Sequence, residues 1–380
     1  MGRTASLGQD SGADVIRVGL IGPCQRPLKP GTFDPRERSL SKDFNAGLSG
    51  VLGTRSGVVE SFHRVHAAVV SDRGKVVASV GDDMWPTVYR SAAKPFQAVP
   101  LVEDGVVEEF GLSSEDLALT AASHNGEDRH IAGVLRILGK VGAPEDGLKL
   151  GPFPPLREET AEALYRSGAA VKPIHNNCSG QHAAMLGLAM IHDWPVDSYL
   201  QVDHPLQGRM LEEMARFTGL ATDDIATMPD GCGMLAFGVP LFNLALSFAK
   251  LGEEAGKGSG AAQVLGAMAG SPFMLGGTGR LCTALAEVTG GRMVGKLGAE
   301  GVYGITLPGE GLGIGIKVED GGRRAGDAAV IRVLDLLGLL DQTESDALEG
   351  FRRMEIKNTL GDVVGELQAN FFFETNRLIS

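Results

Sequence analysis

Valine-rich stretches in which apolar and polar residues partly alternate predict β-strands near both ends of the chain. Residues 58–69 and 75–80 follow this pattern, and the Asp and Gly within 71–74 suit a tight turn, so we expect a hairpin. After Gly290 the sequence becomes apolar in short runs that glycine interrupts, at 292–295, 301–307 and 313–318. These runs predict antiparallel strands with tight connections.

Between residues 92 and 290, apolar residues recur at steps of three and four, which predicts helices. The stretches with this period are 131–138, 161–165, 182–191, 210–217, 234–251 and 281–288, and a last amphipathic helix is expected at 324–340. We therefore predict an α+β fold. Its antiparallel sheet is formed by N- and C-terminal strands, in about 56–90 and 290–340, and a mostly helical region at about 92–290 is inserted between them.

The composition is that of a soluble globular protein, with 43% hydrophobic and 22% charged residues. Residues 1–45 are rich in Gly, Pro, Ser and charge, so we expect a flexible extension there and one domain over 46–380. A net charge of −12 without a basic stripe argues against a nucleic-acid partner.

The apolar run at 233–249 is the nearest approach to a membrane span. Pro240, Asn243 and Ser247 interrupt it, and it is too short to cross a bilayer, so we expect a buried helix and no membrane partner. The N-terminal residues do not show the apolar run of a signal peptide. We therefore expect a cytoplasmic protein.

Ser91 and Lys94 are the first candidates for chemistry. If Ser91 opens a helix, the two side chains lie on one face about one turn apart, so the amine can take the hydroxyl proton. The alternative is that Ser91 caps a helix and Lys94 is a solvated surface charge. Spacing alone does not decide, because Ser39 and Lys42 repeat it within a polar segment.

Two further polar clusters follow in an informative order. Ser123-His124-Asn125 comes next and Lys296-Leu297-Gly298 comes last, after a strand-like run. Penicillin-binding proteins and class A β-lactamases carry Ser-x-x-Lys, Ser-x-Asn and Lys-Thr-Gly in the same order. A lysine amine is protonated at neutral pH unless burial or a second cation lowers its pKa, so two lysines in one pocket would support each other.

Cys178 and Cys232 lie in two more polar clusters, at 175–182 and 230–233. They are either buried structural thiols, a pair of metal ligands or a reactive thiol beside the site. Neither belongs to a Cys-x-x-Cys pair, so their spacing does not predict zinc.

Taken together, these clusters resemble those of the Rhizobium etli-type L-asparaginases, also called class 3. The matching stretches occur in order between about residues 50 and 320, at 89–95, 123–127, 175–180, 230–233, 277–280 and 296–301. That family resembles the serine β-lactamase and glutaminase fold, which fits the predicted order of sheet and helices.

The resemblance implies an L-asparagine amidohydrolase. Ser91 would attack the side-chain amide, Lys94 would take its proton, and a water would resolve the acyl-enzyme to L-aspartate after ammonia leaves. The remaining implied roles fall to Ser123 and Lys296 as a second Ser-Lys pair, Arg90 for the substrate carboxylate, Asp230 for its ammonium, and Asn125 as a further substrate contact. The resemblance also implies a homodimer.

One position departs from the family pattern. Members place a lysine three residues after the first cysteine, where it binds zinc together with both cysteines, whereas this chain has Gln181. A carboxamide is a neutral and weak zinc ligand, so a site of Cys178, Cys232 and Gln181 should bind zinc weakly or not at all. We expect catalysis to require no cofactor.

Other functions remain open from the residues alone. A glutaminase or a β-lactam-type acyl-transfer hydrolase could use the same scaffold, because one methylene changes specificity by only about 1–3 kcal/mol. From a different class, the chain could bind an amino acid without turnover. A cysteine nucleophile at Cys178 is a third alternative.

Overall fold

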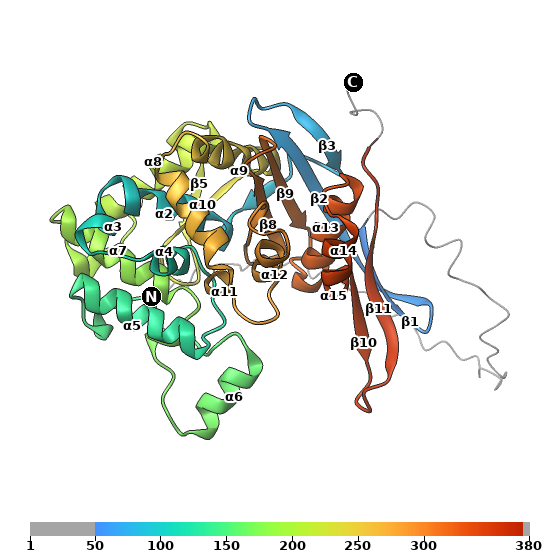
Figure 1. Ribbon diagram of the computed structural model, residues 1–380, viewed down its shortest axis with the longest axis horizontal. Coiled ribbons are helices and arrows are strands. Elements are labelled where there is room, and N and C mark those ends of the chain that lie inside the picture. Colours follow the sequence, from blue (N-terminus) through green and yellow to red (C-terminus); the bar gives the residue numbers. More distant parts are fainter. Residues whose placement is uncertain (1–49, 375–380) are drawn as a thin grey trace, which may run out of the picture. The chain divides into compact units, whose positions relative to one another are not determined.

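The computed structural model describes residues 50–374 (Figure 1). Its larger sheet is antiparallel, with the order β10-β11-β1-β2-β9-β8-β7 and with β3 paired to β2. The strands are β1 (Gly50–Arg55), β2 (Val58–Ser71), β3 (Val76–Val80), β7 (Val294–Leu297), β8 (Val302–Leu307), β9 (Leu312–Val318), β10 (Arg353–Lys357) and β11 (Val363–Asn370). The prediction of an antiparallel sheet built from N- and C-terminal strands is confirmed.

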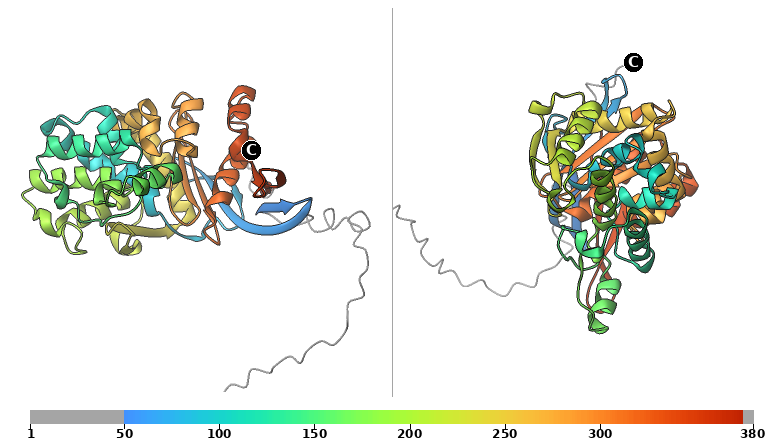
Figure 2. Two further views of the ribbon diagram at one scale, coloured as in Figure 1. Left: turned by 90° about the horizontal axis from the view of Figure 1, so that it is seen from below. Right: turned by 90° about the vertical axis from the view of Figure 1, so that its left-hand side faces the viewer.

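The segment between β3 and β7 is mostly helical. Its helices are α2 (Lys94–Glu103), α3 (Val106–Glu109), α4 (Ser114–Thr120), α5 (Asp128–Val141), α6 (Glu158–Arg166), α7 (Ser179–Ile191), α8 (Pro205–Thr218), α9 (Leu241–Ala255), α10 (Gly260–Gly270), α11 (Pro272–Leu275) and α12 (Leu281–Val288). Three more follow β9, namely α13 (Arg323–Leu336), α14 (Gln342–Ala347) and α15 (Glu349–Arg352). Figures 1 and 2 show the cyan and green helices gathered away from β10 and β11, next to which the red helices lie.

The structure corrects several expectations about elements. The sheet begins at Gly50 instead of near residue 56, and it gains β10 and β11 beyond residue 340. The expected helix at 234–251 is β6 (Leu235–Pro240) followed by α9, because Pro240 has no amide hydrogen and ends the strand. With β4 (Pro86–Val88) and β5 (Ala226–Pro229), β6 forms a second, three-stranded sheet. The extension expected at 1–45 lies outside the described residues.

Both faces of the larger sheet are covered, which explains why β2 is apolar without interruption near its end. Ala67 and Val69 belong to the core under α13, whereas Ala68 and Val70 pack with Leu241 of α9. A strand turns successive side chains to opposite faces, so a continuous apolar run buries both. Within the described residues, no helix is long and apolar enough to cross a membrane.

Helix α9 approaches the sheet closely because glycines leave room for its backbone. A Cβ atom at Gly313 would lie 2.1 Å from the carbonyl oxygen of Ala245 and 2.3 Å from the amide nitrogen of Ala249. A Cβ at Gly304 would meet the ring of Phe248 at 1.9 Å. These contacts seat α9 against β8 and β9 and so fix β7, which pairs with β8 and carries Lys296.

We expect Gly313→Ala to destabilise the fold by about 1–3 kcal/mol or more, because the new methyl group meets backbone atoms that cannot move separately from α9. Urea unfolding of the purified variant measures the loss. The matched control is Gly309→Ala, since no atom lies within 4 Å of a Cβ built there. Equal stability of the two variants would contradict this account of the packing.

Candidate active site

Ser91 is held on a tight turn between β4 and α2. The turn is the 3₁₀ helix η1 (Arg90–Ala93), in which the backbone N–H of Lys94 bonds to the carbonyl of Ser91. Three residues make one turn of such a helix, so Ser91 and Lys94 share a face. Ser91 is not the residue that caps α2, since that position is Ala93. The capping alternative raised by the sequence is therefore not what the structure shows.

The backbone of Arg90 is strained. Its φ angle is +48°, in the left-handed region that non-glycine residues rarely adopt. Tyr89 anchors the turn from inside, because its hydroxyl hydrogen-bonds Oγ of Ser247 at 2.7 Å and its N–H donates to the carbonyl of Phe237 at 2.9 Å. The half-buried Ser91 is thereby presented to a cavity.

Ser123 and Lys296 form the second pair, although 173 residues separate them. Nζ of Lys296 lies 3.0 Å from Oγ of Ser123 and also donates to the carbonyl of Leu297 at 2.8 Å. The amine is completely buried, and burial together with the positive charge of Lys94 lowers the pKa of Lys296 to about 7. It can therefore give up its proton near neutral pH.

Lys94 reaches the same place from the other side. Its side chain is 3% exposed, and Nζ donates to the carbonyl of Ala122, the residue before Ser123. The two lysines therefore flank the Ser123 segment, as the sequence order had led us to expect. The contacts of Lys94, Lys296 and Ser123 therefore bring η1, β7 and the loop after α4 together.

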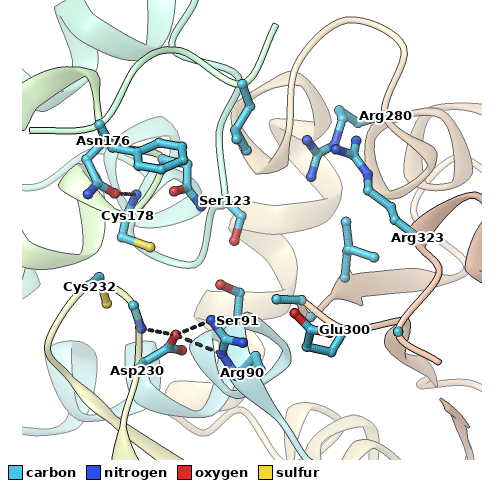
Figure 3. Close-up of a pocket in the computed structure, with 18 residues that line it drawn as sticks. Arg90, Ser91, Ser123, Asn176, Cys178, Asp230, Cys232, Arg280, Glu300 and Arg323 are labelled. Carbon is cyan, nitrogen blue, oxygen red and sulfur yellow. Dashed lines mark hydrogen bonds and ion pairs between the residues drawn. The ribbon is translucent and has the colours of Figure 1, made fainter. Parts of the chain in front are cut away.

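A cavity of about 410 Å³ opens onto both serines (Figure 3). It is lined by Arg90, Ser91, Ser123, Phe153, Leu156, Asn176, Asn177, Cys178, Asp230, Gly231, Cys232, Arg280, Leu297, Gly298, Ala299, Glu300, Gly321 and Arg323. Of these, Phe153, Asn176, Arg280, Glu300 and Arg323 were not singled out from the sequence. Three of them, Asn176, Arg280 and Glu300, lie inside the motif stretches 175–180, 277–280 and 296–301, which was the available signal.

Arg90 and Asp230 form an ion pair at one side of the cavity. Nε and Nη2 of Arg90 each lie 2.8 Å from Oδ1 of Asp230, and the backbone N–H of Gly231 also donates to Oδ1. The pair bridges η1 and the loop between β5 and β6. It holds the strained Arg90 backbone in place next to Ser91.

Asn125 lies beside the cavity without lining it. Its Nδ2 donates to the carbonyl of Thr278 at 2.9 Å and to Oε1 of Glu127 at 3.1 Å, and its Oδ1 accepts from Nη1 of Arg280 at 3.3 Å. These bonds occupy the amide with protein partners. The structure therefore shows Asn125 holding the loop that carries Arg280.

Glu127 fixes the same loop. Burial raises its pKa, but hydrogen bonds from Thr278, Asn125 and Arg157 outweigh this and lower the pKa of Glu127 to about 2. Gly277 has a φ of +102°, and a Cβ there would lie 2.2 Å from Oε1 of Glu127. Only glycine suits this position.

The thiols of Cys178 and Cys232 line the cavity at the side of Asp230 (Figure 3). A hydrogen bond from the Cys232 thiol to Cys178, together with the charge of Lys94, holds the pKa of Cys178 below its usual range. The pKa of Cys232 is correspondingly raised. Both cysteines are buried.

The donor set does not complete a zinc site. A structural zinc takes four ligands, of which these thiols would supply two. The amide of Gln181 is turned to that of Gln97, with Nε2 of Gln181 donating to Oε1 of Gln97 at 2.6 Å, and the cationic Lys94 lies beside Cys178. Across residues 50–374, no group of three or more His, Cys, Asp or Glu side chains is arranged to hold a metal ion.

The comparison with curated proteins finds no match. Among solved structures, the chain is similar to Mglu in its native form in the presence of 4.3 M NaCl, with 16% identity, a TM-score of 0.41, and coverage of 78% of this chain and 66% of that chain. It is also similar to Mglu in its glutamate form, with 15% identity, a TM-score of 0.38, and coverage of 73% and 61%. The chain thus spans less than two thirds of the length of these structures.

The family comparison covers nearly the whole of the described part. Residues 51–369 match the L-asparaginase II family, a range that runs from β1 into β11 and contains every side chain of the cavity. The chain belongs to the L-asparaginase II family.

Proposed function

We propose that this protein is an L-asparagine amidohydrolase of the Rhizobium etli type that works through a serine acyl-enzyme. The observation that carries the proposal is that two serines line one cavity and a buried lysine lies close to each, with Nζ of Lys296 already 3.0 Å from Oγ of Ser123. Family membership supports the amidohydrolase class. The motif order and the sheet of terminal strands support a fold related to serine β-lactamases and glutaminases.

We assign different catalytic roles to Ser91 and Ser123 because their side chains differ in solvent exposure. Ser91 is half-buried and open to the cavity, so its Oγ attacks the side-chain carboxamide carbon, and Lys94 takes the hydroxyl proton when its amine is in the neutral form. The C–N bond breaks, the proton leaves with ammonia, and an aspartyl ester remains on Ser91. Water then cleaves this ester to L-aspartate. Ser123 is 5% exposed and bonded to Lys296, which suits a proton relay.

The substrate preference is tested by ammonia release from L-asparagine and L-glutamine. We expect asparagine to be favoured in kcat/KM by about 10-fold or more. A preference for glutamine would make the chain a glutaminase, and cleavage of a chromogenic β-lactam without ammonia release would indicate the β-lactam-type alternative. Heat-shift stabilisation by asparagine without ammonia release would identify a binding protein.

We also propose that catalysis needs no metal, because the side chains around Cys178 do not complete a zinc site. Protein purified without chelator is expected to contain zinc well below one ion per chain, and dialysis against a chelator should leave the rate of ammonia release unchanged. Stoichiometric zinc that leaves together with activity would overturn this.

The remaining parts of the proposal rest on the resemblance and on charge. We propose a cytoplasmic homodimer that acts on a small molecule and has no nucleic-acid or membrane partner. Residues 46–380 would form the asparaginase domain. Sedimentation of the purified protein at micromolar concentration tests the dimer.

A further inference from the structure

Arg280 and Arg323 form a positively charged corner of the cavity, across from Asp230 and Cys232 (Figure 3). Arg280 comes just before α12, and Arg323 is the first residue of α13. Arg280 is 6% exposed, whereas Arg323 lies at the open edge and is exposed. Two helices from different parts of the chain therefore bring their guanidinium groups to one wall.

The charge of Arg280 is not paired. Within residues 50–374, the one hydrogen bond made by its side chain is the 3.3 Å bond to Asn125, and it takes part in no ion pair. A guanidinium has five N–H donors, and leaving such a buried cation without a counter-charge is costly. The loop that carries it is nevertheless held rigidly by Glu127, as described above. The protein thus holds the buried guanidinium of Arg280 in a fixed position at the cavity.

One carboxylate lies near this corner and balances part of its charge. Asp327, one turn further along α13, forms no ion pair with either arginine; burial raises its pKa to about 6, against the opposing effect of the charges of Arg323 and Arg280. Glu300 lines the cavity on the side of Arg90 (Figure 3). Partial loss of water around its guanidinium and the charge of Arg280 lower the pKa of Arg323, so the two arginines repel each other. An anion placed between them would relieve that repulsion.

Arg90, in contrast, already forms an ion pair with Asp230. Two of its N–H groups point to Oδ1 of Asp230, and Gly231 donates to the same oxygen. In the described part of the chain, Oδ2 of Asp230 has no hydrogen-bond partner. The pair is neutral overall and offers a free acceptor, which suits a cationic group better than a second carboxylate.

We propose that Arg280, with Arg323 at the rim, binds the carboxylate of the substrate, while Oδ2 of Asp230 on the opposite wall receives its ammonium group. This reassigns the role that the resemblance gave to Arg90, which becomes the residue that holds Asp230. The inference rests on the proposed function in taking an amino-acid amide as the ligand. It makes a free carboxylate a requirement of the substrate class.

The test measures binding without turnover, by calorimetry on Ser91→Ala protein. The ligands are L-asparagine and L-asparaginamide, which differ in the carboxylate that the second lacks. Adding Arg280→Gln is expected to weaken asparagine binding by about 10- to 100-fold, the loss typical of a charged hydrogen bond, and to leave asparaginamide binding unchanged. Adding Arg323→Gln should weaken asparagine binding by about 3- to 10-fold, because water screens the rim.

The matched control is Arg324→Gln, the next residue of α13, which bonds Ser61 instead of facing the cavity. It should change neither affinity. In protein with Ser91 intact, Arg280→Gln should raise KM more than it lowers kcat. Because Arg323 is exposed, its variant should fold even if Arg280→Gln does not, and Arg280→Lys should keep part of the affinity.

Equal loss of both ligands, or a carboxylate-selective loss in Arg90→Gln with none in Arg280→Gln and Arg323→Gln, would overturn the inference and leave the proposed function standing. A wild-type chain that releases no ammonia from asparagine but binds L-aspartate through Arg280 would overturn the function and leave the carboxylate site standing. If neither asparagine nor aspartate binds, both the carboxylate site and the proposed function are contradicted.

Discussion

Replacing Lys296 by methionine is expected to lower kcat/KM for asparagine by about 10³-fold or more and, at the same time, to stabilise the folded chain at pH 7. Activity falls because the proton relay with Ser123 loses its base. Stability rises because the amine is completely buried, and burial lowers its pKa from 10.5 to about 7. That shift corresponds to a cost of up to about 4 kcal/mol, which a methionine of similar length avoids.

The same variant gives a pH test with a definite sign. Between pH 7 and 10 the unfolded chain keeps the Lys296 proton longer than the folded chain does, so wild-type stability rises with pH in this window. The stability advantage of Lys296→Met should therefore shrink towards pH 10. Wild-type kcat/KM should rise with pH through an apparent pKa near 7, since the amine must be neutral to accept a proton.

Urea unfolding at pH 7 and at pH 10, combined with ammonia release, measures all three effects. Lys75→Met is the matched control, because Lys75 is exposed on the hairpin between β2 and β3, and it should shift stability by less than about 0.5 kcal/mol. If Lys296→Met is active, or is less stable than the wild type at pH 7, the buried neutral amine is not the basis of the site.

Replacing Ser91 by alanine is expected to reduce asparagine hydrolysis by about 10³- to 10⁶-fold, because the acyl group then has no oxygen to attach to. Ser123→Ala should cost less, about 10²- to 10⁴-fold, since it removes a relay and leaves the nucleophile. Steady-state ammonia release compares the two variants. Ser39→Ala is the control, because Ser39 repeats the Ser-x-x-Lys spacing within a polar segment that has no apolar periodicity.

The opposite order of effects would exchange the roles of the two serines. Unchanged activity in Ser91→Ala combined with loss in Cys178→Ala would transfer the role of nucleophile to the Cys178 thiol, whose lowered pKa favours the reactive thiolate. Under the serine mechanism, Cys178→Ala should keep most of the activity.

Structural features formed by residues close together in the chain were predictable from the sequence. Ser91 and Lys94 are three residues apart, so the 3₁₀ turn was open to prediction from spacing, and the valine-rich runs at 58–69 and 75–80 located the first hairpin. The meeting of Ser123 with Lys296 was predictable only from the order of three motifs. No local pattern joins residues 173 positions apart.

Other features depend on contacts that a linear pattern does not contain. The motif of Asn125 predicts a substrate contact, but it does not predict the hydrogen bonds by which Asn125 also supports the loop with Thr278 and Arg280. Arg323 directly precedes the amphipathic helix predicted at 324–340, and it lines the cavity because α13 packs on the sheet. β10 and β11 were not predicted, because most of their side chains are exposed or half-buried and because the two strands come after a predicted helix.

The central claim is that Ser91 carries the acyl group, and mass spectrometry of acid-quenched protein during turnover of L-asparagine tests it most directly. The account predicts a mass increase equal to one aspartyl group on the peptide that contains Ser91, absent in Ser91→Ala and accumulating in Ser123→Ala if deacylation slows. An aspartyl group on Ser123 or Cys178, or continued ammonia release by Ser91→Ala, would contradict it.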